Sequence, residues 1–485
     1  MESITYSDLE KRVLSYTPLD VMKLRRAYDY AKKYHENQFR ASGEPYIIHP
    51  LNVAYILSFM HADMDTIIAS LLHDVVEDTE STLDEIEKNF NKTVRELVDG
   101  VTKMTKLDLN NKKELSAVNI RRLIVSLARD PRIIIIKLVD RLHNMRTLEY
   151  KSEKKQLEKA LETLEIYVPL SYYIGANKIR DELENLSFKY LKPSIYGDIK
   201  KQREDLKRET KSLVEEEVKK LTNLFKKNGI KVSFEIRYKD NYSIYKKLIT
   251  KETFDMIHDM ISVKVLVKNV RDCYMALMLI HEAYTPINDR FKDYIAKPKT
   301  NMYKSIHTTV FGPDNRFLQF QIRTHEMEQV AIFGLTSYWF KYKNNARIHM
   351  QKDLENNFQF FKEIKELDST ILDNTEFLSQ VKKELFGSNI YVYTTGGDVI
   401  ELPSGATVID FAYKIHTDIG NNMVAAIVNS EAVPFDYVLS NQDKVRIITD
   451  DKAYIPKFDW LDKVVTTSAR NKIMDYIKEH EEKEE

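Results

Sequence analysis

Two pairs of polar residues, His73-Asp74 and Glu77-Asp78, interrupt an otherwise apolar stretch over residues 65–78. At about 100° per residue, the spacing predicts one continuous helix with apolar pairs on one side and these polar pairs on the other. His73 would then lie one turn from Glu77, and Asp74 one turn from Asp78. An imidazole beside three carboxylates is a donor set that suits a divalent metal. An acidic, solvated helix face has the same pattern, so the stretch needs partners elsewhere in the chain to form a site.

A histidine upstream is the first candidate partner. His49 precedes a proline, which biases its backbone towards an extended conformation. Pro50 itself suits the first turn of a helix over residues 51–60. Taken alone, His49 is more often a histidine at a helix start, or packed in a core, than a metal ligand.

An aspartate downstream is the second candidate. Asp130-Pro131 predicts a helix start. The first four apolar residues of the stretch 133–145 could form a strand, but its longer apolar pattern favours a buried helix. Asp140 lies on the polar stripe of that helix, where an aspartate is usually paired with an arginine, and Arg141 and Arg146 are both near enough. Each of these signals is weak when it is considered singly.

Composition limits the classes of protein that come into question. The 485 residues suffice for about three domains, and 43% hydrophobic content is enough to form real cores. The 74 basic residues balance 74 acidic ones, which argues against binding nucleic acid by bulk attraction. A single cysteine, Cys273, excludes an internal disulfide framework. Without a signal-like N-terminus or an apolar run approaching the roughly 20 residues of a spanning helix, the sequence predicts a soluble, cytoplasmic protein with no membrane contact.

Considered together, the candidate residues resemble a known superfamily. Residues 39–50 read Phe-Arg-Ala-Ser-Gly-Glu-Pro-Tyr-Ile-Ile-His-Pro, residues 73–79 read His-Asp-Val-Val-Glu-Asp-Thr, and residues 139–146 read Val-Asp-Arg-Leu-His-Asn-Met-Arg. Their order and spacing resemble the HD phosphohydrolases, and more closely the hydrolase domain of the RelA/SpoT family of ppGpp enzymes. That resemblance implies an all-helical domain that removes the 3′ pyrophosphate from ppGpp and pppGpp.

The resemblance also implies a role for each matching residue. It assigns one Mn²⁺ to His49, His73, Asp74 and Asp140, the attacking water to Glu77 and Asp78, and the nucleotide pocket to Arg40, Ser42, Asn144 and Thr147. The residue types suit this chemistry, because two imidazoles and two carboxylates leave positions on an octahedral ion for water and a phosphate oxygen. Carboxylates one turn from the ligands can orient that water and manage its proton. The products would be pyrophosphate and GDP or GTP.

A second domain begins after a Lys/Glu-rich connecting helix over residues 198–227. Beyond Asn228-Gly229 the pattern changes to that of an α/β domain. The predicted strands cover residues 231–238, 260–267 and 317–323, and the predicted helices cover residues 241–251 and 271–283.

This second domain resembles the family's synthetase domain, which transfers pyrophosphate from ATP to the 3′-hydroxyl of GDP or GTP. The matching motifs are residues 237–247, 290–299, 301–309 and 321–324. The resemblance places nucleotide contacts at Arg237, Lys239, Lys247, Arg290, Lys292, Lys299, Tyr303 and His307, and puts Asp259 in the place of the metal-binding aspartate.

Departures from that motif predict that the synthetase domain is inactive or very weak. Gln319 stands where the family has a glutamate that binds Mg²⁺ and accepts the proton of the attacking hydroxyl. A neutral amide cannot act as a general base, and that loss alone typically costs about 10²–10⁴-fold in rate. Mg²⁺ is therefore expected only if the domain is active, although GDP or GTP binding there could still influence the hydrolase. Five further departures are Ile236, Asp240, Lys264, Glu328 and Tyr338.

The remaining chain predicts a helical linker and a small β module. A hairpin over residues 389–402 turns at Gly396-Gly397, a helix over 407–416 follows, and strands are expected at 423–428 and 444–449 before a charged helix over 468–485. This pattern resembles the family's TGS module. The resemblance implies that His416 contacts the acceptor end of uncharged tRNA on the ribosome, while a plain helix-end histidine is an equal alternative. Long family members continue with regulatory domains that this sequence lacks, which weakens the expectation of ribosome-linked starvation sensing.

The resulting fold class is multidomain α+β. The expected parts are an all-α HD hydrolase domain (1–195), a nucleotidyltransferase-like α/β domain (196–345), a helical linker (346–387), a β-grasp TGS domain (388–450) and a helical tail (451–485). The leading hypothesis is a Mn²⁺-dependent ppGpp 3′-pyrophosphohydrolase with an inactive synthetase domain. The alternatives are a bifunctional enzyme, another HD phosphohydrolase acting for instance on deoxynucleotides, and a non-catalytic regulator that binds guanine nucleotide or tRNA.

Overall fold

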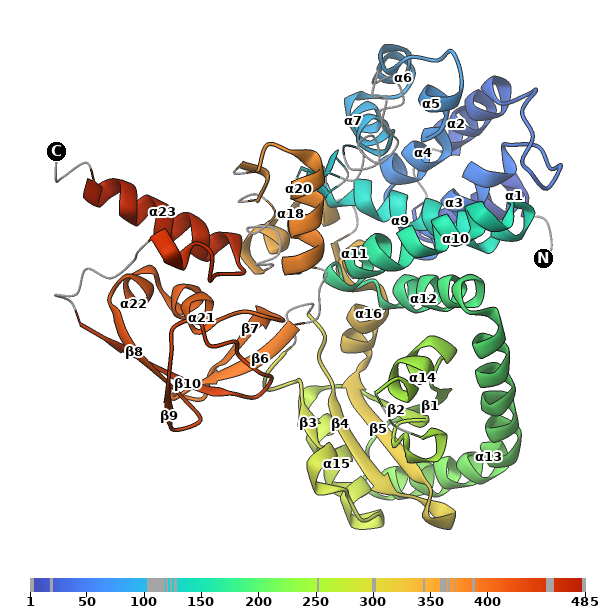
Figure 1. Ribbon diagram of the computed structural model, residues 1–485. Coiled ribbons are helices and arrows are strands. Elements are labelled where there is room, and N and C mark those ends of the chain that lie inside the picture. Colours follow the sequence, from blue (N-terminus) through green and yellow to red (C-terminus); the bar gives the residue numbers. More distant parts are fainter. Residues whose placement is uncertain are drawn as a thin grey trace. The chain divides into compact units, whose positions relative to one another are not determined.

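The chain folds into two units, which are described separately. The first consists of Met1–Thr105 with Arg129–Phe358, and the second of Lys106–Ala128 with Gln359–Glu485. The computed structural model (Figure 1) describes residues 4–17, 21–102, 118, 121–122, 124–125, 129–250, 253–298, 302–342, 345–357, 364, 367–369, 371–385, 389–450 and 458–481. Within these ranges, every helix is too short or too polar to cross a membrane.

The first part of unit 1 is all-helical, as predicted. Its helices are α1 Tyr6–Leu14, α2 Val21–Tyr34, α3 Ile48–Ser58, α4 Met64–Leu72, α5 Val75–Asp78, α6 Leu83–Asn89, α7 Lys92–Val101, α9 Pro131–Arg146, α10 Glu153–Glu162, α11 Val168–Tyr173 and α12 Asn177–Leu191. A 3-10 turn, Leu148–Tyr150, follows α9, and a π-helical turn, Thr163–Tyr167, joins α10 to α11. α9 packs against α3, α7 and α12, so the apolar stretch predicted as a buried helix lies at the centre of this domain.

Two local predictions in this domain are wrong. The continuous helix over residues 65–78 is broken, because α4 ends at Leu72 and α5 begins at Val75. His73 and Asp74 form the junction, which turns His73 inwards while α4 is buried nearly all round. His49 lies inside the first turn of α3 and is not extended, because its N–H donates to the Tyr46 carbonyl and completes a helical turn (2.9 Å).

The start of α9 follows the sequence closely. Asp130 is the N-cap and accepts a hydrogen bond from the Arg132 N–H (3.0 Å), and Pro131 occupies the first helical position. The Arg132 guanidinium also lies 3.2 Å from Asp63, which caps α4. The contact between Arg132 and Asp63 links the start of α9 to the start of α4. Both helices position candidate site residues.

The second part of unit 1 is the expected α/β domain. The long helix α13, Pro193–Lys227, leads into it (Figure 1). Its strands are β1 Ser233–Tyr238, β2 Ile261–Val267, β3 Lys292–Asp293, β4 Ile306–Phe311 and β5 Phe317–Thr324, in the sheet order β1-β2-β5-β4-β3. The helices that accompany them are α14 Asn241–Leu248, α15 Val270–Ala283, α16 His325–Phe333, α17 Ser337–Tyr342 and α18 Ala346–Asn357. Short 3-10 turns cover Phe254–Met256, Asn288–Arg290, Pro313–Asn315 and Gly334–Thr336.

Alternating apolar residues build the core of this sheet. β2 and β5 pair in parallel at its centre, and all other pairs are antiparallel. Leu318, Phe320 and Ile322 of β5 are buried against α15, and Phe225 of α13 belongs to the same core. The strand β4 was missed as an element by the sequence prediction, which treated residues 301–309 only as a motif.

A glycine permits the sheet domain to contact the helical domain. At Gly334, a Cβ would lie 2.2 Å from the backbone of Gly175, and its φ of 54° disfavours other residues. The neighbouring Leu335 N–H donates to the Ile174 carbonyl (2.8 Å), and Trp339 Nε1 donates to Asp63 (2.9 Å). The two domains of unit 1 therefore share buried polar contacts.

Unit 2 contains the predicted β module. The helices are α20 Asn374–Gln380, α21 Val408–Ile415, α22 Thr417–Asn421 and α23 Thr467–Glu481, with a π-helical turn, Val381–Leu385, and a 3-10 turn, Phe458–Trp460. The strands β6 Asn389–Thr394, β7 Val399–Pro403, β8 Met423–Val428, β9 Glu431–Val433 and β10 Lys444–Thr449 form a sheet in the order β7-β6-β10-β8-β9. Ala469 and Ile473 of α23 are buried in the core of the module. The buried Asp410 accepts hydrogen bonds from Thr466 just before that helix.

Candidate functional site

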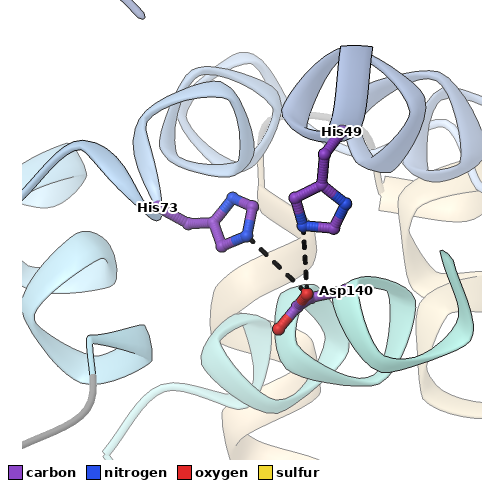
Figure 2. A group of neighbouring side chains, drawn as sticks. All are labelled: His49, His73 and Asp140. Atoms are coloured by element: carbon purple, nitrogen blue, oxygen red, sulfur yellow. Dashed lines mark ion pairs between the residues drawn. The ribbon is translucent and has the colours of Figure 1, made fainter. Parts of the chain in front are cut away.

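Three buried side chains from separate helices meet in the helical domain (Figure 2). His49 comes from α3, His73 directly follows α4, and Asp140 lies in α9. Asp140 Oδ1 is 3.2 Å from His49 Nε2 and 3.8 Å from His73 Nε2. One ligand atom from each residue lies within 4.8 Å of the other two. This arrangement could hold a metal ion.

The fourth predicted ligand, Asp74, lies beside these three. Its Oδ1 is 3.2 Å from His73 Nε2, and its Oδ2 is 3.6 Å from His49 Nε2. The side chain is 14% exposed, whereas both imidazoles are almost completely buried. The four residues therefore place two imidazoles and two carboxylates together.

One buried polar atom of the cluster, Nε2 of His73, makes no hydrogen bond. His73 Nδ1 lies 2.7 Å from the Ser70 carbonyl, which can only accept, so Nδ1 carries a proton. In the neutral ring, Nε2 then presents a lone pair, and that buried atom makes no hydrogen bond. Buried polar atoms are rarely left unsatisfied, and a metal ion would satisfy this one together with the carboxylates.

The charges around the cluster favour an ionised aspartate. Burial works to raise the pKa of Asp140, but Lys137 and the two imidazoles outweigh it and hold the pKa well below its usual range. Burial lowers the pKa of His49. For His73, burial is outweighed by Asp74 and Asp140, which raise its pKa. An ionised carboxylate and a neutral imidazole are the forms that bind metals.

Lys137, not an arginine, is the ionic partner of Asp140. Its Nζ lies 2.9 Å from Asp140 Oδ2, leaving Oδ1 towards the histidines. Arg141 and Arg146 instead pair with glutamates of later segments, at 2.9 Å and 2.6 Å. The expectation that either arginine pairs with Asp140 is therefore wrong. The spacing of three residues on one helix was the signal that points to the lysine.

The two carboxylates predicted to handle water lie in α5, and one of them is linked to the cluster. The Tyr46 hydroxyl is 2.9 Å from both Asp74 Oδ2 and Asp78 Oδ2. Its single proton can be donated to only one of them at a time. Glu77, on the same short helix, is partly buried. Sequence reasoning missed Tyr46, although it stands three residues before His49.

The residues predicted to contact nucleotide divide into two groups. Arg40 Nη2 donates to Asn144 Oδ1 (3.0 Å) and lies 3.2 Å from Thr147 Oγ1. Asn144 in turn donates to Asp140 Oδ1 (2.5 Å), so these three residues adjoin the cluster. Ser42 instead donates to Glu44 (3.0 Å).

A third histidine, His143 of α9, was also missed from the sequence and contacts His49 of the cluster. His143 Nδ1 lies 2.8 Å from His49 Nδ1, and both rings are buried. Burial, His49 and Arg40 lower the pKa of His143 to about 3. His143 stands one helical turn after Asp140, which is the spacing that could have identified it.

The sheet domain contains a cavity of about 1000 Å³. It opens between the sheet and the segments α11–α12 and α16 of the same unit. Predicted residues of this site that line it are Arg237, Lys239, Lys247, Asp259, Arg290, Lys292, Tyr303, His307 and Gln319. Lys299, which was also predicted here, lies outside the described residues. The structure thus collects residues from several separate motifs into one pocket.

The carboxylate and the amide at the predicted metal position have different surroundings. Lys239 Nζ lies 2.5 Å from Asp259 Oδ2, while Asp259 Oδ1 is buried without a hydrogen bond. Burial works to raise the pKa of Asp259, but Lys239 and Lys247 lower it on balance. The Gln319 oxygen accepts from Gln321 Nε2 (3.0 Å). Only one carboxylate therefore occupies the expected pair of metal-binding positions, which is a poor fit for Mg²⁺.

Two departures from the family motif contact each other. Lys264 Nζ is 2.7 Å from Glu328 Oε1, and Arg323 Nη1 is 3.1 Å from Glu328 Oε2. All three side chains are nearly buried at the pocket. A third departure, Asp240, caps α14 by accepting from the Ser243 N–H (2.9 Å). These substitutions have structural partners, so they are not merely surface variation.

The predicted RNA-contacting histidine lies at a junction between two helices of unit 2. His416 follows α21 and caps α22 by accepting from the Asp418 N–H (3.3 Å). Its side chain is 65% exposed. The helix-end role is thus present, and the ring is also accessible to a partner.

Three regions of the chain match known domain families. Residues 27–176 match the HD domain, residues 236–347 match a region found in RelA / SpoT proteins, and residues 390–449 match the TGS domain. The predicted fold class, with a helical HD domain, a mixed-sheet synthetase domain and a TGS domain, is confirmed.

Curated relatives match nearly the whole chain. It is 42% identical over 467 residues to a GTP pyrophosphokinase of Myxococcus xanthus, covering 96% of this chain and 61% of that protein. It is 41% identical to the GTP pyrophosphokinase rsh of Brucella ovis, covering 96% and 62%. It is 40% identical over 482 residues to a guanosine-3′,5′-bis(diphosphate) 3′-pyrophosphohydrolase of Aquifex aeolicus, covering 98% and 67%. The chain thus spans about three fifths to two thirds of the length of these relatives. The three matched domains and these identities show that the chain belongs to the RelA/SpoT family.

Proposed function

We propose that the helical domain is a metal-dependent 3′-pyrophosphohydrolase of ppGpp and pppGpp. The observation that carries this proposal is the buried cluster of His49, His73 and Asp140, with Asp74 beside it. The relative from Aquifex aeolicus, which bears the name of this activity, aligns over 98% of the chain. The proposed metal is Mn²⁺, since the mixed imidazole and carboxylate donors suit such an ion.

The roles of the surrounding residues follow from their positions. When bound, the metal would supply Lewis acidity and lower the pKa of a water. Asp78 would accept a proton from the attacking water and Glu77 would orient it, while Tyr46 holds the Asp78 carboxylate towards the cluster. Arg40, held beside Asn144 and Thr147, binds a phosphate or the guanine face of the nucleotide. Ser42 contacts the nucleotide from the adjoining loop.

The decisive experiment identifies the products. The protein with Mn²⁺ and ppGpp is expected to release pyrophosphate and GDP, and not orthophosphate. EDTA or Asp74→Ala should abolish the release, while Asp259→Asn in the other pocket should leave it unchanged. Hydrolysis that persists at the same rate after Asp74→Ala would contradict the metal assignment.

The synthetase-like pocket is proposed to have little or no transfer activity. Gln319 offers an amide where transfer needs a base, and Asp259, the aspartate of the same pocket, is paired with Lys239. The competing proposal is a bifunctional enzyme, which the pyrophosphokinase names of two relatives favour. Incubation with ATP and GDP distinguishes them, because only the bifunctional enzyme forms labelled ppGpp.

The same pocket is proposed to bind GDP or GTP and influence the hydrolase. Adjacent residues of α12 pair with Arg237 of the pocket, through Asp181 (2.7 Å), and with Arg146 of α9, the helix that carries Asp140, through Glu182 (2.6 Å). A nucleotide that contacts Arg237 would compete with the first of these pairs. GDP is therefore expected to change the hydrolysis rate of wild type, but not of the variant with both Arg237→Ala and His307→Ala. If GDP changes the hydrolysis rate of that variant as much as it changes the rate of wild type, this role is refuted.

For the TGS domain, we propose contact between His416 and the acceptor end of uncharged tRNA. The exposure of the ring supports this assignment. Retarded migration of tRNA by wild type but not by His416→Ala would agree with it, and equal binding by both proteins would refute it.

A further inference from the structure

We infer that His143 is a positioning residue of the metal centre, which orients His49 by accepting a hydrogen bond from its Nδ1–H. This rests on the proposed metal centre but not on the identity of the substrate. The two Nδ1 atoms lie 2.8 Å apart, a distance that requires one nitrogen to donate and the other to accept.

The direction of that hydrogen bond follows from the geometry of His49. Its Nε2 faces the cluster, 3.2 Å from Asp140 Oδ1 and 3.6 Å from Asp74 Oδ2. A metal held there takes the Nε2 lone pair, so the proton of neutral His49 lies on Nδ1. His143 Nδ1 must then be the acceptor. His143 lies on α9 one turn from Asp140, so the same helix positions this acceptor and a second proposed ligand.

The two histidines of the cluster differ in how their tautomers are fixed. His73 donates from Nδ1 to a backbone carbonyl, that of Ser70 (2.7 Å), which no side-chain substitution removes. His49 depends on a side chain, and its ring centroid lies 4.9 Å from that of His143. Metal-ligating histidines generally need such a partner, and removing one typically costs about 10- to 100-fold in metal affinity. His143 is therefore a position at which the affinity for metal can be changed without replacing a ligand.

Two substitutions separate hydrogen bonding from packing. His143→Leu keeps an apolar side chain in the buried position but removes the acceptor. His143→Asn places an amide oxygen close to the former Nδ1 and restores an acceptor. His61→Asn is a matched control, because His61 stacks on Tyr16 in the same domain (centroids 4.5 Å apart) and its φ of 58° tolerates asparagine.

The experiment measures Mn²⁺ binding to the metal-free full-length protein, without nucleotide, by the electron paramagnetic resonance of free Mn²⁺. His143→Leu should weaken binding by about 10- to 100-fold, whereas His143→Asn and His61→Asn should bind nearly as wild type does. Circular dichroism of each variant checks that it is folded. Equal affinity of His143→Leu and wild type would overturn the inference, as would equal weakening by both His143 variants. If wild type does not bind Mn²⁺, the metal centre is refuted. If wild type binds Mn²⁺ but does not hydrolyse ppGpp, only the proposed substrate is refuted.

Discussion

The proposed metal centre of the helical domain and the pocket of the sheet domain differ in what their carboxylates contact. In the helical domain, Asp74 and Asp140 face two imidazoles, and Asp140 is also paired with Lys137. In the sheet domain, the acidic side chains form ion pairs with basic ones. Lys239 pairs with Asp259, and Lys264 and Arg323 pair with Glu328. Two acidic sites in one unit thus have opposite surroundings.

This difference indicates whether each site favours a cationic or an anionic ligand. A carboxylate that faces a neutral imidazole lone pair retains its capacity to bind a cation. Asp259 faces lysines instead of imidazoles, and these cations favour an anionic ligand such as a nucleotide phosphate. We therefore expect metal-dependent chemistry in the helical domain and binding without efficient transfer in the sheet domain.

Removal of a proposed metal ligand should have the largest effect. Asp140→Asn is expected to reduce ppGpp hydrolysis by at least about 10³-fold, because a catalytic metal supplies several kcal/mol of transition-state stabilisation. The corresponding change in the other pocket, Asp259→Asn, should leave the hydrolysis rate unaltered. Steady-state release of pyrophosphate measures both. Equal sensitivity to the two substitutions would remove the distinction between the sites.

Loss of the carboxylates that handle water should have a smaller effect on rate and none on metal binding. Asp78→Asn or Glu77→Gln is expected to lower kcat by about 10²–10⁴-fold, the usual contribution of general acid–base catalysis. Mn²⁺ affinity should stay close to that of wild type, since neither residue is a proposed ligand. A variant that loses Mn²⁺ binding together with activity would place its residue among the ligands instead.

Replacing Gln319 of the sheet domain by the glutamate of the family motif tests why the two sites differ in activity. Gln319→Glu is expected to raise ppGpp formation from ATP and GDP by at least about 10²-fold, if the missing base is the main block. The Gln321 Nε2 donor can bond a carboxylate at this position as well as an amide. Labelled ATP with thin-layer separation gives the rate, and Gln319→Ala serves as the control. If Gln319→Glu gains no activity, the other departures also obstruct transfer.

The smallest effect concerns the paired departures Lys264 and Glu328. Lys264→Met and Glu328→Gln should each destabilise the sheet domain, because each leaves a buried partner with less compensation. The double variant should be more stable than the sum of the singles predicts, with a coupling of about 0.5–3 kcal/mol. Urea unfolding followed by Trp339 fluorescence in a Trp460→Phe background provides the measurement. Strict additivity would show that Lys264 and Glu328 contribute to stability independently of each other.

Much of the fold could be predicted from sequence, because its signals are local. The cap at Asp130-Pro131 and the long apolar pattern after it gave α9, and the glycines after β6 gave the hairpin. The break between α4 and α5 could not be predicted in this way. Its apolar residues keep helical spacing across the junction, and only packing around His73 reveals the turn.

The candidate sites were predictable to the extent that motifs encode them. The motifs named His49, His73 and Asp140, which the structure brings together from distant parts of the chain. Lys137 and His143 could have been found from their helical spacing to Asp140, but spacing alone does not say which neighbours turn inwards. The contact between Lys264 and Glu328 was hidden, because β2 and α16 are far apart in sequence.

One titration tests the central claim most directly. Mn²⁺ is added to metal-free wild-type protein in two parallel reactions, one with ppGpp and one with ATP and GDP. Pyrophosphate release from ppGpp should rise from background and saturate with Mn²⁺, while ppGpp formation stays at background with Mn²⁺ or Mg²⁺. Full hydrolysis in EDTA, or ppGpp formation at a rate comparable to its hydrolysis, would contradict the assignment of metal-dependent hydrolysis to one domain and lapsed transfer to the other.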